Sequence, residues 1–358
     1  MNILKKASIL GSAGKFDSCG PRQCEIKVSN SLNGLYQSES ENKNCVMLKT
    51  LMTNKCVFDC GFCSNSSRSK PFSSVSFSPD ELLRVFLDAR KNLGVNGLFL
   101  SSSISGNPDG VMEDIISAAS LVRTRFGGYI HLKVMPGASF DFVKRACEVA
   151  NRVSINLESP SSSSLRDVSD CKDFKVDILR RQSWIKRFSR SQSTQMVVRS
   201  DDSDLSVLKM SNWEYNNMGL KRVYYSAFSP VRGTFFENKD AVSLRRQNSL
   251  YKADFLLREY GFKFEEIKSV LDNDMLPFED VKVALAKNYF SNHIDVNDAS
   301  SSELLRVPGI GLVSSARVFA SRGRISSFSD LKRLGVNIKR AAPFIKIEGS
   351  KQLTLNSF

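Results

Sequence analysis

The sequence predicts an α/β fold with a parallel sheet, followed by a small all-α domain. Strand-like apolar runs recur between residues 45 and 230, and helical patterns lie between them. Strands that alternate with helices indicate a parallel sheet joined by right-handed crossovers. Beyond residue 293 only short helical patterns follow, separated by glycine turns. The chain is therefore expected to combine two architectures.

The first strand and the first helix carry the clearest local signals. Residues 45–52 (CVMLKTLM) predict a short buried strand. A helix is expected at 78–94, because Ser78 and Pro79 are typical of a helix start and Gly94 of a helix end. The next strand and helix are expected at 95–103 and 109–127, and later strands at 128–137, 152–160, 193–201 and 221–230. A connecting helix is expected within 243–267, ending near Gly261.

Composition narrows the class of protein. The 358 residues are 41% hydrophobic, which is enough for one large domain and a small one. Eight cysteines in such a chain are too few for a disulfide scaffold. The first twenty residues lack the apolar core of a secretory signal, and no run approaches the ~18 apolar residues of a membrane span. We expect a reduced, cytoplasmic protein without membrane contact.

Three of the cysteines suggest a metal site. Cys56, Cys60 and Cys63 stand in a C-x3-C-x2-C pattern directly after the first expected strand. A structural zinc ion needs four ligands, and Cys45, eleven residues before Cys56, is a candidate for the fourth. Three ligands with one open position suit an iron–sulfur cluster whose fourth iron binds a reactant. The residues alone leave both alternatives open.

The C-x3-C-x2-C pattern, with Phe62 directly before the last cysteine, resembles the signature of the radical SAM enzymes. The resemblance implies a [4Fe–4S] cluster on Cys56, Cys60 and Cys63, with S-adenosylmethionine (SAM) on the fourth iron. One electron, from a reductant such as flavodoxin or ferredoxin, would then release a 5′-deoxyadenosyl radical. It also implies a partial (β/α)6 TIM-like barrel, with chemistry at the C-terminal ends of the strands.

The resemblance also implies the SAM contacts. Phe62 would lie against the adenine. Ser102 and Ser103 stand where the family usually has a Gly-Gly-Glu-like segment. Asn156 and Glu158 alternate at the end of the fourth strand and would face the ribose and the methionyl group. Arg199, after the fifth strand, would pair with the SAM carboxylate; a strand-end cap or an exposed arginine are the structural alternatives.

A second motif lies near the C-terminus. Residues 297–324 resemble a helix-hairpin-helix motif, in which backbone amides at a helix start hold a nucleic-acid phosphate. Ala316 and Val318 are expected core positions of its second helix. Residues 330–345 repeat the motif in degraded form around Leu334-Gly335-Val336. The nucleic-acid contacts expected from this resemblance are Val307, Gly309, Ile310, Gly311, Arg317, Gly335 and Arg340.

The charge of the tail supports a polyanionic partner. Residues 300–358 hold ten Lys or Arg and three acidic residues, a difference of +7, which is half of the chain's +14. Clustered positive charge favours salt-sensitive binding to nucleic acid. The basic residues are Arg306, Arg317, Arg322, Arg324, Lys332, Arg333, Lys339, Arg340, Lys346 and Lys351, and the acidic ones Glu303, Asp330 and Glu348.

Together, the two motifs resemble a family of putative DNA modification or repair radical SAM proteins. The resemblance implies DNA bound without sequence preference and a uracil-DNA-glycosylase-like partner. The alternatives are a radical SAM enzyme of structured RNA, or a non-catalytic DNA-binding protein with a structural zinc or iron–sulfur site. The expected domains are an N-terminal extension (1–44), a barrel (45–235), a helical connector docked on the barrel (236–292) and a tandem helix-hairpin-helix module (293–358).

Overall fold

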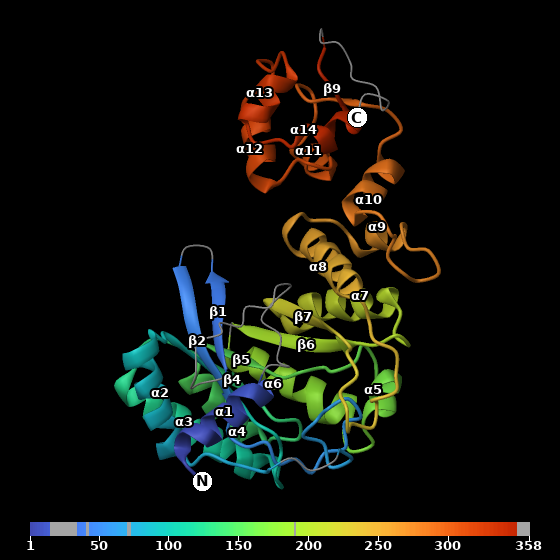
Figure 1. Ribbon diagram of the computed structural model, residues 1–358. Coiled ribbons are helices and arrows are strands. Elements are labelled where there is room, and N and C mark those ends of the chain that lie inside the picture. Colours follow the sequence, from blue (N-terminus) through green and yellow to red (C-terminus); the bar gives the residue numbers. More distant parts are fainter. Residues whose placement is uncertain (15–33, 41–42, 70–72, 190, 349–358) are drawn as a thin grey trace. The chain divides into compact units, whose positions relative to one another are not determined.

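The computed structural model describes residues 1–14, 34–40, 43–69, 73–189 and 191–348. Its main sheet has seven strands in the order of the chain, and it forms the lower part of Figure 1. β1 pairs with β2 in antiparallel fashion, and all later neighbours are parallel. The strands are β1 (Leu35–Ser40), β2 (Lys43–Leu51), β3 (Gly97–Ser101), β4 (Tyr129–Lys133), β5 (Arg152–Ser154), β6 (Gln192–Val198) and β7 (Arg222–Ala227).

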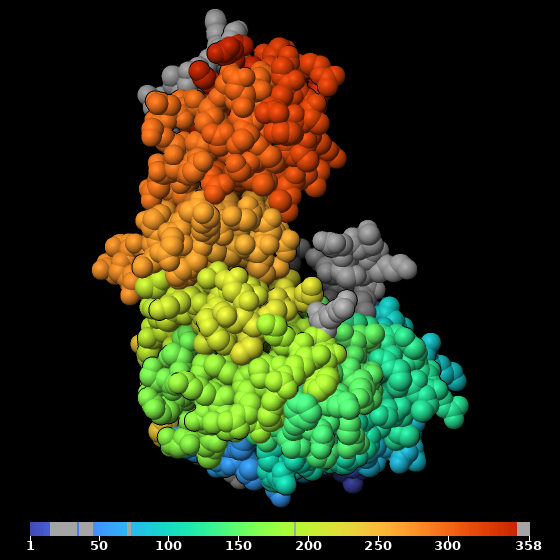
Figure 2. Space-filling model, turned by 180° about the vertical axis from the view of Figure 1, so that it is seen from behind, coloured from blue at the N-terminus to red at the C-terminus, as the bar shows by residue number. Residues whose placement is uncertain are grey.

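The six parallel strands β2–β7 form the curled half-barrel that the sequence predicts. Each crossover carries at least one helix. Seen from behind, much of the surface of this part of the chain is coloured teal to yellow-green, the range that contains most of these crossovers (Figure 2). The helices that accompany this sheet are α1 (Ile3–Ala13), α2 (Pro79–Leu93), α3 (Pro108–Arg125), α4 (Phe140–Val149), α5 (Ser162–Val168), the π-helix η2 (Phe174–Leu179), α6 (Arg180–Phe188), α7 (Asp204–Trp213) and the π-helix η3 (Glu214–Met218).

Local sequence signals place these elements correctly. Ser78 caps α2 through a capping box with Glu81, and Gly94 ends the helix in the left-handed conformation at φ +67°. The strands at 45–52, 95–103 and 128–137 and the helices at 78–94 and 109–127 are confirmed, with boundary shifts of a few residues. The strand expected at 152–160 is shorter than predicted, because β5 ends at Ser154 and Asn156 and Glu158 lie beyond it. The exception is the N-terminal extension: residues 1–44 show no regular pattern in sequence, yet α1 and β1 lie within them.

The described chain divides into two compact units, and each is considered by itself. One contains residues 1–202 and 210–247, and the other residues 203–209 and 248–358. Residues 248–292, predicted as a connector docked on the barrel, thus group with the tail. The elements after the sheet are α8 (Leu244–Glu259), α9 (Phe264–Lys268), α10 (Val281–Tyr289), β8 (Ile294–Asp295), α11 (Ser301–Arg306), α12 (Leu312–Ala320), α13 (Phe328–Arg333), α14 (Ile338–Ala341), the 3-10 helix η4 (Ala342–Phe344) and β9 (Ile345–Lys346).

The tail has a hydrophobic core of its own. Buried side chains from α11, α12, α13 and α14 meet there, and β8 pairs with β9 in parallel. The core residues include Val296, Leu304, Val307, Ile310, Val318, Leu331, Val336 and Ile345. Four short helices thus pack around one small core, together with the strand pair β8 and β9, which the expected all-α domain does not contain. In the described part of the chain, no helix is both long and apolar enough to cross a membrane.

One buried carboxyl makes the stability of the barrel unit depend on pH. Glu214, in η3, is fully buried, and its oxygens have no hydrogen-bond partner of normal geometry among the described residues. Burial raises the pKa of Glu214 to about 8, although the Gln182 side chain opposes the shift. Between its ordinary pKa of 4.5 and about 8, the folded protein retains a proton that the unfolded chain has lost.

We therefore expect the unfolding free energy to fall as pH rises through this window. The slope from one such group is up to about 1.4 kcal/mol per pH unit, and the loss ends above pH 8. Glu214→Gln should remove this slope and raise the melting temperature at pH 8 relative to the unsubstituted protein. Thermal unfolding followed by circular dichroism from pH 5 to 9 measures this. Parallel pH curves for the two proteins would contradict the assignment.

Candidate functional site

The cysteine loop begins at the C-terminal end of β2, where a barrel places its chemistry. Backbone hydrogen bonds fix it to the loop after β3 and to the end of α5: Val57 N–H donates to the Ile104 carbonyl at 2.7 Å, and Gly61 N–H to the Val168 carbonyl at 2.8 Å. A Cβ at Gly61 would lie 2.6 Å from the Phe236 ring, so any other residue there would force this buried ring to shift. The loop is therefore held in place by the elements around it.

The three thiols lie close enough to interact electrostatically. Cys60 is 7% exposed, while Cys56 and Cys63 are half-buried, and none of the three is in a disulfide. Burial, together with the nearby Cys60, raises the pKa of Cys63 to about 12. Burial also raises the pKa of Cys60. A cationic metal centre that accepts three thiolates would offset these costs of ionisation.

Cys45 does not belong to this loop. It pairs with Ser38 near the N-terminal end of β2, six residues before the strand ends. At about 3.3 Å per residue, this separates its backbone from the loop by roughly 20 Å. A zinc site that uses Cys45 as the fourth ligand is therefore excluded by the strand geometry.

Asp59, inside the cysteine motif, fastens the loop to residues 169–171. Its carboxylate accepts hydrogen bonds from the Ser169 hydroxyl and from the backbone N–H of Asp170 at 3.1 Å, and Arg68 Nη2 lies 2.8 Å away. Although burial opposes ionisation, the hydrogen bond from Ser169 and those from the backbone lower the pKa of Asp59 to about 2. Sequence reasoning missed Asp59, although its place between two cysteines was a usable signal.

The predicted SAM contacts gather around the same end of the sheet. Ser102 and Ser103 follow β3; the Ser103 N–H donates to the Thr53 carbonyl at 2.9 Å, and the Ser102 hydroxyl to the Ser103 carbonyl at 2.8 Å. Phe62 and Asn156 are both half-buried. The contacts of these four residues with SAM remain predictions.

Glu158 adopts an uncommon backbone conformation. Its φ is +65°, and two hydrogen bonds hold it there: its N–H donates to the Gln195 carbonyl at 3.0 Å, and Val197 N–H donates to the Glu158 carbonyl at 2.9 Å. The side chain pairs with Lys172 at 3.4 Å. Lys172 carried no signal in the sequence, because only the fold brings it to the cysteine loop.

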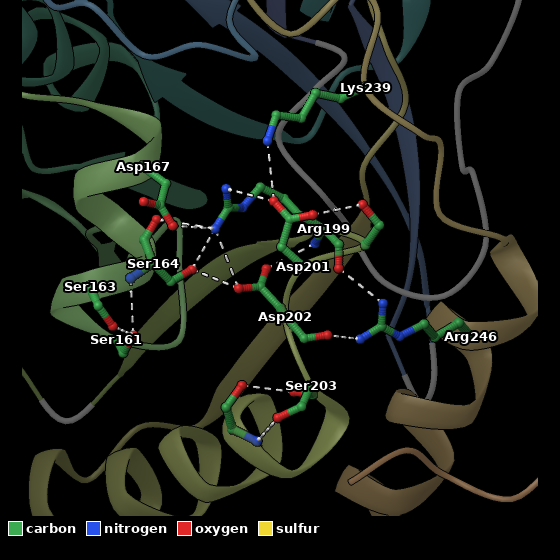
Figure 3. A network of polar contacts seen from close by, with 12 residues as sticks. Ser161, Ser163, Ser164, Asp167, Arg199, Asp201, Asp202, Ser203, Lys239 and Arg246 are labelled. Atoms are coloured by element: carbon green, nitrogen blue, oxygen red, sulfur yellow. Dashed lines mark hydrogen bonds and ion pairs between the residues drawn. The ribbon is translucent and has the colours of Figure 1, made fainter. Parts of the chain in front are cut away.

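Arg199 lies at the centre of a network of charges rather than on an exposed loop. Its guanidinium is 3% exposed and lies 3.5 Å from Asp202, 3.6 Å from Asp167 and 3.7 Å from Asp201, and Nη2 donates to the Ser164 hydroxyl at 2.8 Å (Figure 3). Lys239 in turn pairs with Asp201 at 3.2 Å. The protein's own carboxylates compensate the charge of Arg199, so its expected pairing with SAM stays a prediction.

The turn between α11 and α12 contains the first predicted hairpin. Gly309 requires its residue type, because its φ is +87° and a Cβ would lie 2.5 Å from the Asn337 carbonyl. Gly311 has an ordinary φ of −98°. Its N–H donates to the Ser314 hydroxyl at 2.7 Å, and the Leu312 N–H donates to the Tyr260 hydroxyl. The amides expected to hold phosphate thus have partners within the protein.

The side chains of the tail partly follow the prediction. Val318 is buried as expected, whereas Ala316, also expected in the core, is exposed because it lies on the outer side of α12. Val307 and Ile310, expected to contact nucleic acid, are buried in the core of the tail. Arg317 and Gly335 are exposed. Arg340 is 44% exposed and pairs with Asp280 at 2.9 Å.

Comparison with known proteins places the cysteine loop in a family. Residues 50–187 match the radical SAM superfamily. No curated protein matches the chain in sequence. Among solved structures, methylornithine synthase (PylB) is similar at 15% identity and a TM-score of 0.49, over 58% of this chain and 60% of that one. The hydrogenase maturase HydG from Carboxydothermus hydrogenoformans is similar at 17% identity and a TM-score of 0.49, over 58% and 50%.

SuiB of Streptococcus suis, solved with S-adenosylmethionine, is similar at 13% identity and a TM-score of 0.47, over 58% of this chain and 47% of that one. The chain therefore spans about half to three fifths of the length of these structures. The matched segment contains the end of β2, the cysteine loop and the parallel strands β3, β4 and β5. Residues 50–187 of the chain therefore form a radical SAM domain.

Proposed function

We propose that this protein is a radical SAM enzyme that modifies or repairs DNA. The observation that carries the proposal is the C-x3-C-x2-C loop at the C-terminal end of β2, inside a radical SAM domain. The tail supports the choice of substrate, because residues 300–358, which contribute most of this small helical body, carry half of the net charge of the chain. DNA is preferred over structured RNA because paired helix-hairpin-helix modules are typical of duplex DNA binding.

The cysteine loop fits a four-iron cluster better than a single metal ion. Among the residues that the structure describes, no three His, Cys, Asp or Glu side chains converge closely enough to hold one ion. A zinc ion requires such convergence, whereas a four-iron cluster takes each thiolate on a different iron. Cys56, Cys60 and Cys63 would hold it, and with Cys45 excluded one iron remains for SAM.

Radical SAM enzymes use a [4Fe–4S] cluster and SAM, and the bound pair supplies a 5′-deoxyadenosyl radical that takes hydrogen from the substrate. The residues of this chain bind and orient. Asp59 keeps the cysteine loop against residues 169–171, and Gly61 lets the Phe236 ring close over it. The electron comes from a flavodoxin or ferredoxin, and a uracil-DNA-glycosylase-like protein is the partner that fits a repair role.

The tail would hold DNA mainly through exposed basic side chains. The amides of the first hairpin already have partners, so they add phosphate contacts only where DNA displaces these. Lys332, Arg333 and Lys339 are exposed on α13 and α14. Contacts of this kind position the duplex without reading bases, so binding would be indifferent to sequence.

The test is anaerobic reconstitution of the full chain with iron and sulfide, followed by an assay for 5′-deoxyadenosine. With SAM and dithionite, we expect 5′-deoxyadenosine to form, and duplex DNA to raise its rate. A rate raised by structured RNA but not by duplex DNA would move the substrate to the RNA alternative. Reconstituted protein that forms no 5′-deoxyadenosine under any of these conditions would refute the enzymatic function.

A further inference from the structure

A buried lysine lies beside the cysteine loop, and the C-x3-C-x2-C pattern does not point to it. Lys172 follows α5 and is 9% exposed. Its ammonium group lies 3.4 Å from Glu158 Oε1 and close enough to the Cys60 sulfur to interact with it electrostatically. The Phe58 ring centre lies 5.8 Å from the same nitrogen. A single buried cation thus contacts one cysteine of the loop and the carboxylate that follows β5.

The backbone before Lys172 is fixed by the cysteine motif itself. Asp59 accepts hydrogen bonds from the Ser169 hydroxyl and from the N–H groups of Asp170 and Cys171, the last at 3.3 Å. Arg68 bridges Asp59 and Asp170. Because Lys172 directly follows this anchored segment, its position relative to Cys60 is set by the loop that holds the thiols. The contact is built into the fold rather than made by a mobile surface chain.

The charges around Lys172 matter most when Cys60 is a thiolate ligand. The Lys172 ammonium group then faces the Cys60 sulfur and the Glu158 carboxylate, and Cys63 is also close enough to interact with it. One-electron reduction adds a negative charge to a cluster on three thiolates. A fixed cation in a poorly solvated position stabilises the reduced cluster more than the oxidised one. Hydrogen bonds to the sulfurs and nearby charge are the means by which a protein sets such a potential.

We propose that Lys172 is a positioning residue for the cluster. It donates a charge-assisted hydrogen bond to the Cys60 thiolate and makes the cluster easier to reduce, while Glu158 competes for the same ammonium group. The inference rests on the proposed function, because it requires the three cysteines to hold an iron–sulfur cluster. The proposal adds Lys172, which the family signature does not contain. It also states that Lys172 makes the midpoint potential of the cluster less negative.

The experiment uses the full chain, reconstituted anaerobically without SAM, and measures iron content and the cluster midpoint potential by an EPR-monitored dithionite titration. Lys172→Met should shift the midpoint to a more negative value. Lys172→Arg, which keeps the charge, should restore it toward that of the unsubstituted protein. Glu158→Gln should shift it to a more positive value, because the ammonium group then has Cys60 as its remaining anionic partner. Lys144→Met, on the exposed face of α4, is the matched control.

Lys172→Met alone leaves Glu158 partly buried without its cation, so the double variant Lys172→Met/Glu158→Gln is measured beside it. Midpoints more negative than that of the unsubstituted protein in both neutral variants support the proposal. Loss of iron from both neutral variants, with retention in Lys172→Arg and native circular dichroism throughout, also supports it. An unshifted or more positive midpoint in either neutral variant, or iron loss in all three Lys172 variants, overturns it. Absence of a cluster in the unsubstituted protein would refute the proposed function instead.

Discussion

Replacing Cys56, Cys60 and Cys63 together by alanine is expected to leave the protein colourless and without iron after anaerobic isolation. The unsubstituted protein should be brown and lose its colour in air. The reason is the donor set: three thiols share one anchored loop, and Cys45 lies at the other end of β2. Without thiolates, no ligand of the right softness remains in that loop. Iron and sulfide analysis with the visible absorption spectrum measures the effect.

The matched control is Cys147→Ala, since Cys147 is a half-buried cysteine of α4 outside the loop. It should retain the iron content and colour of the unsubstituted protein, and both variants should keep native circular dichroism. Stoichiometric zinc without iron in the anaerobically isolated protein would contradict the cluster. The non-catalytic alternative with a structural metal ion would then be favoured.

The sequence predicts the barrel well because each of its signals is local. Ser78 with Glu81 and Gly94 define α2 through backbone hydrogen bonds that neighbouring residues complete. Short apolar runs give most of the strands for the same reason. The N-terminal residues are the exception, because α1 and β1 receive much of their stability from packing and pairing with β2, which no local pattern reveals.

The cysteine loop was predictable as a motif, and its surroundings were not. Asp59 and Ser169 are 110 positions apart in sequence, and only the fold brings the carboxylate to the hydroxyl. The fold likewise brings Lys172 close to Cys60. The hairpin turn is a different case. The sequence predicts the requirement for glycine at position 309, but only the structure gives the reason, which is the close approach of the Asn337 carbonyl within the tail.

DNA affinity is expected to depend on the exposed basic side chains of the tail. Lys332, Arg333 and Lys339 lie on α13 and α14, and Arg333 is 79% exposed. Changing all three to glutamine should weaken duplex binding at least tenfold at low salt. It should also make the salt dependence shallower by roughly one logarithmic unit for each phosphate that is no longer neutralised. Unrelated duplexes should be affected alike, because such side chains read no base information.

The control is a triple glutamine variant of Arg84, Lys91 and Lys144, which removes the same charge from exposed positions on α2 and α4. It should bind DNA almost as tightly as the unsubstituted chain, because the positive field of the tail is local.

Deleting residues 293–358 should abolish binding and leave iron and SAM binding intact, since the tail core is separate from the sheet. Gly309→Val is a poor substitute for this deletion, because the added side chain would strike the Asn337 carbonyl and destabilise the tail itself. If the truncated chain bound duplex DNA as tightly as the full chain in matched salt titrations, the tail would be a protein-docking module. The case for a DNA substrate would then depend on the basic surface of the barrel alone.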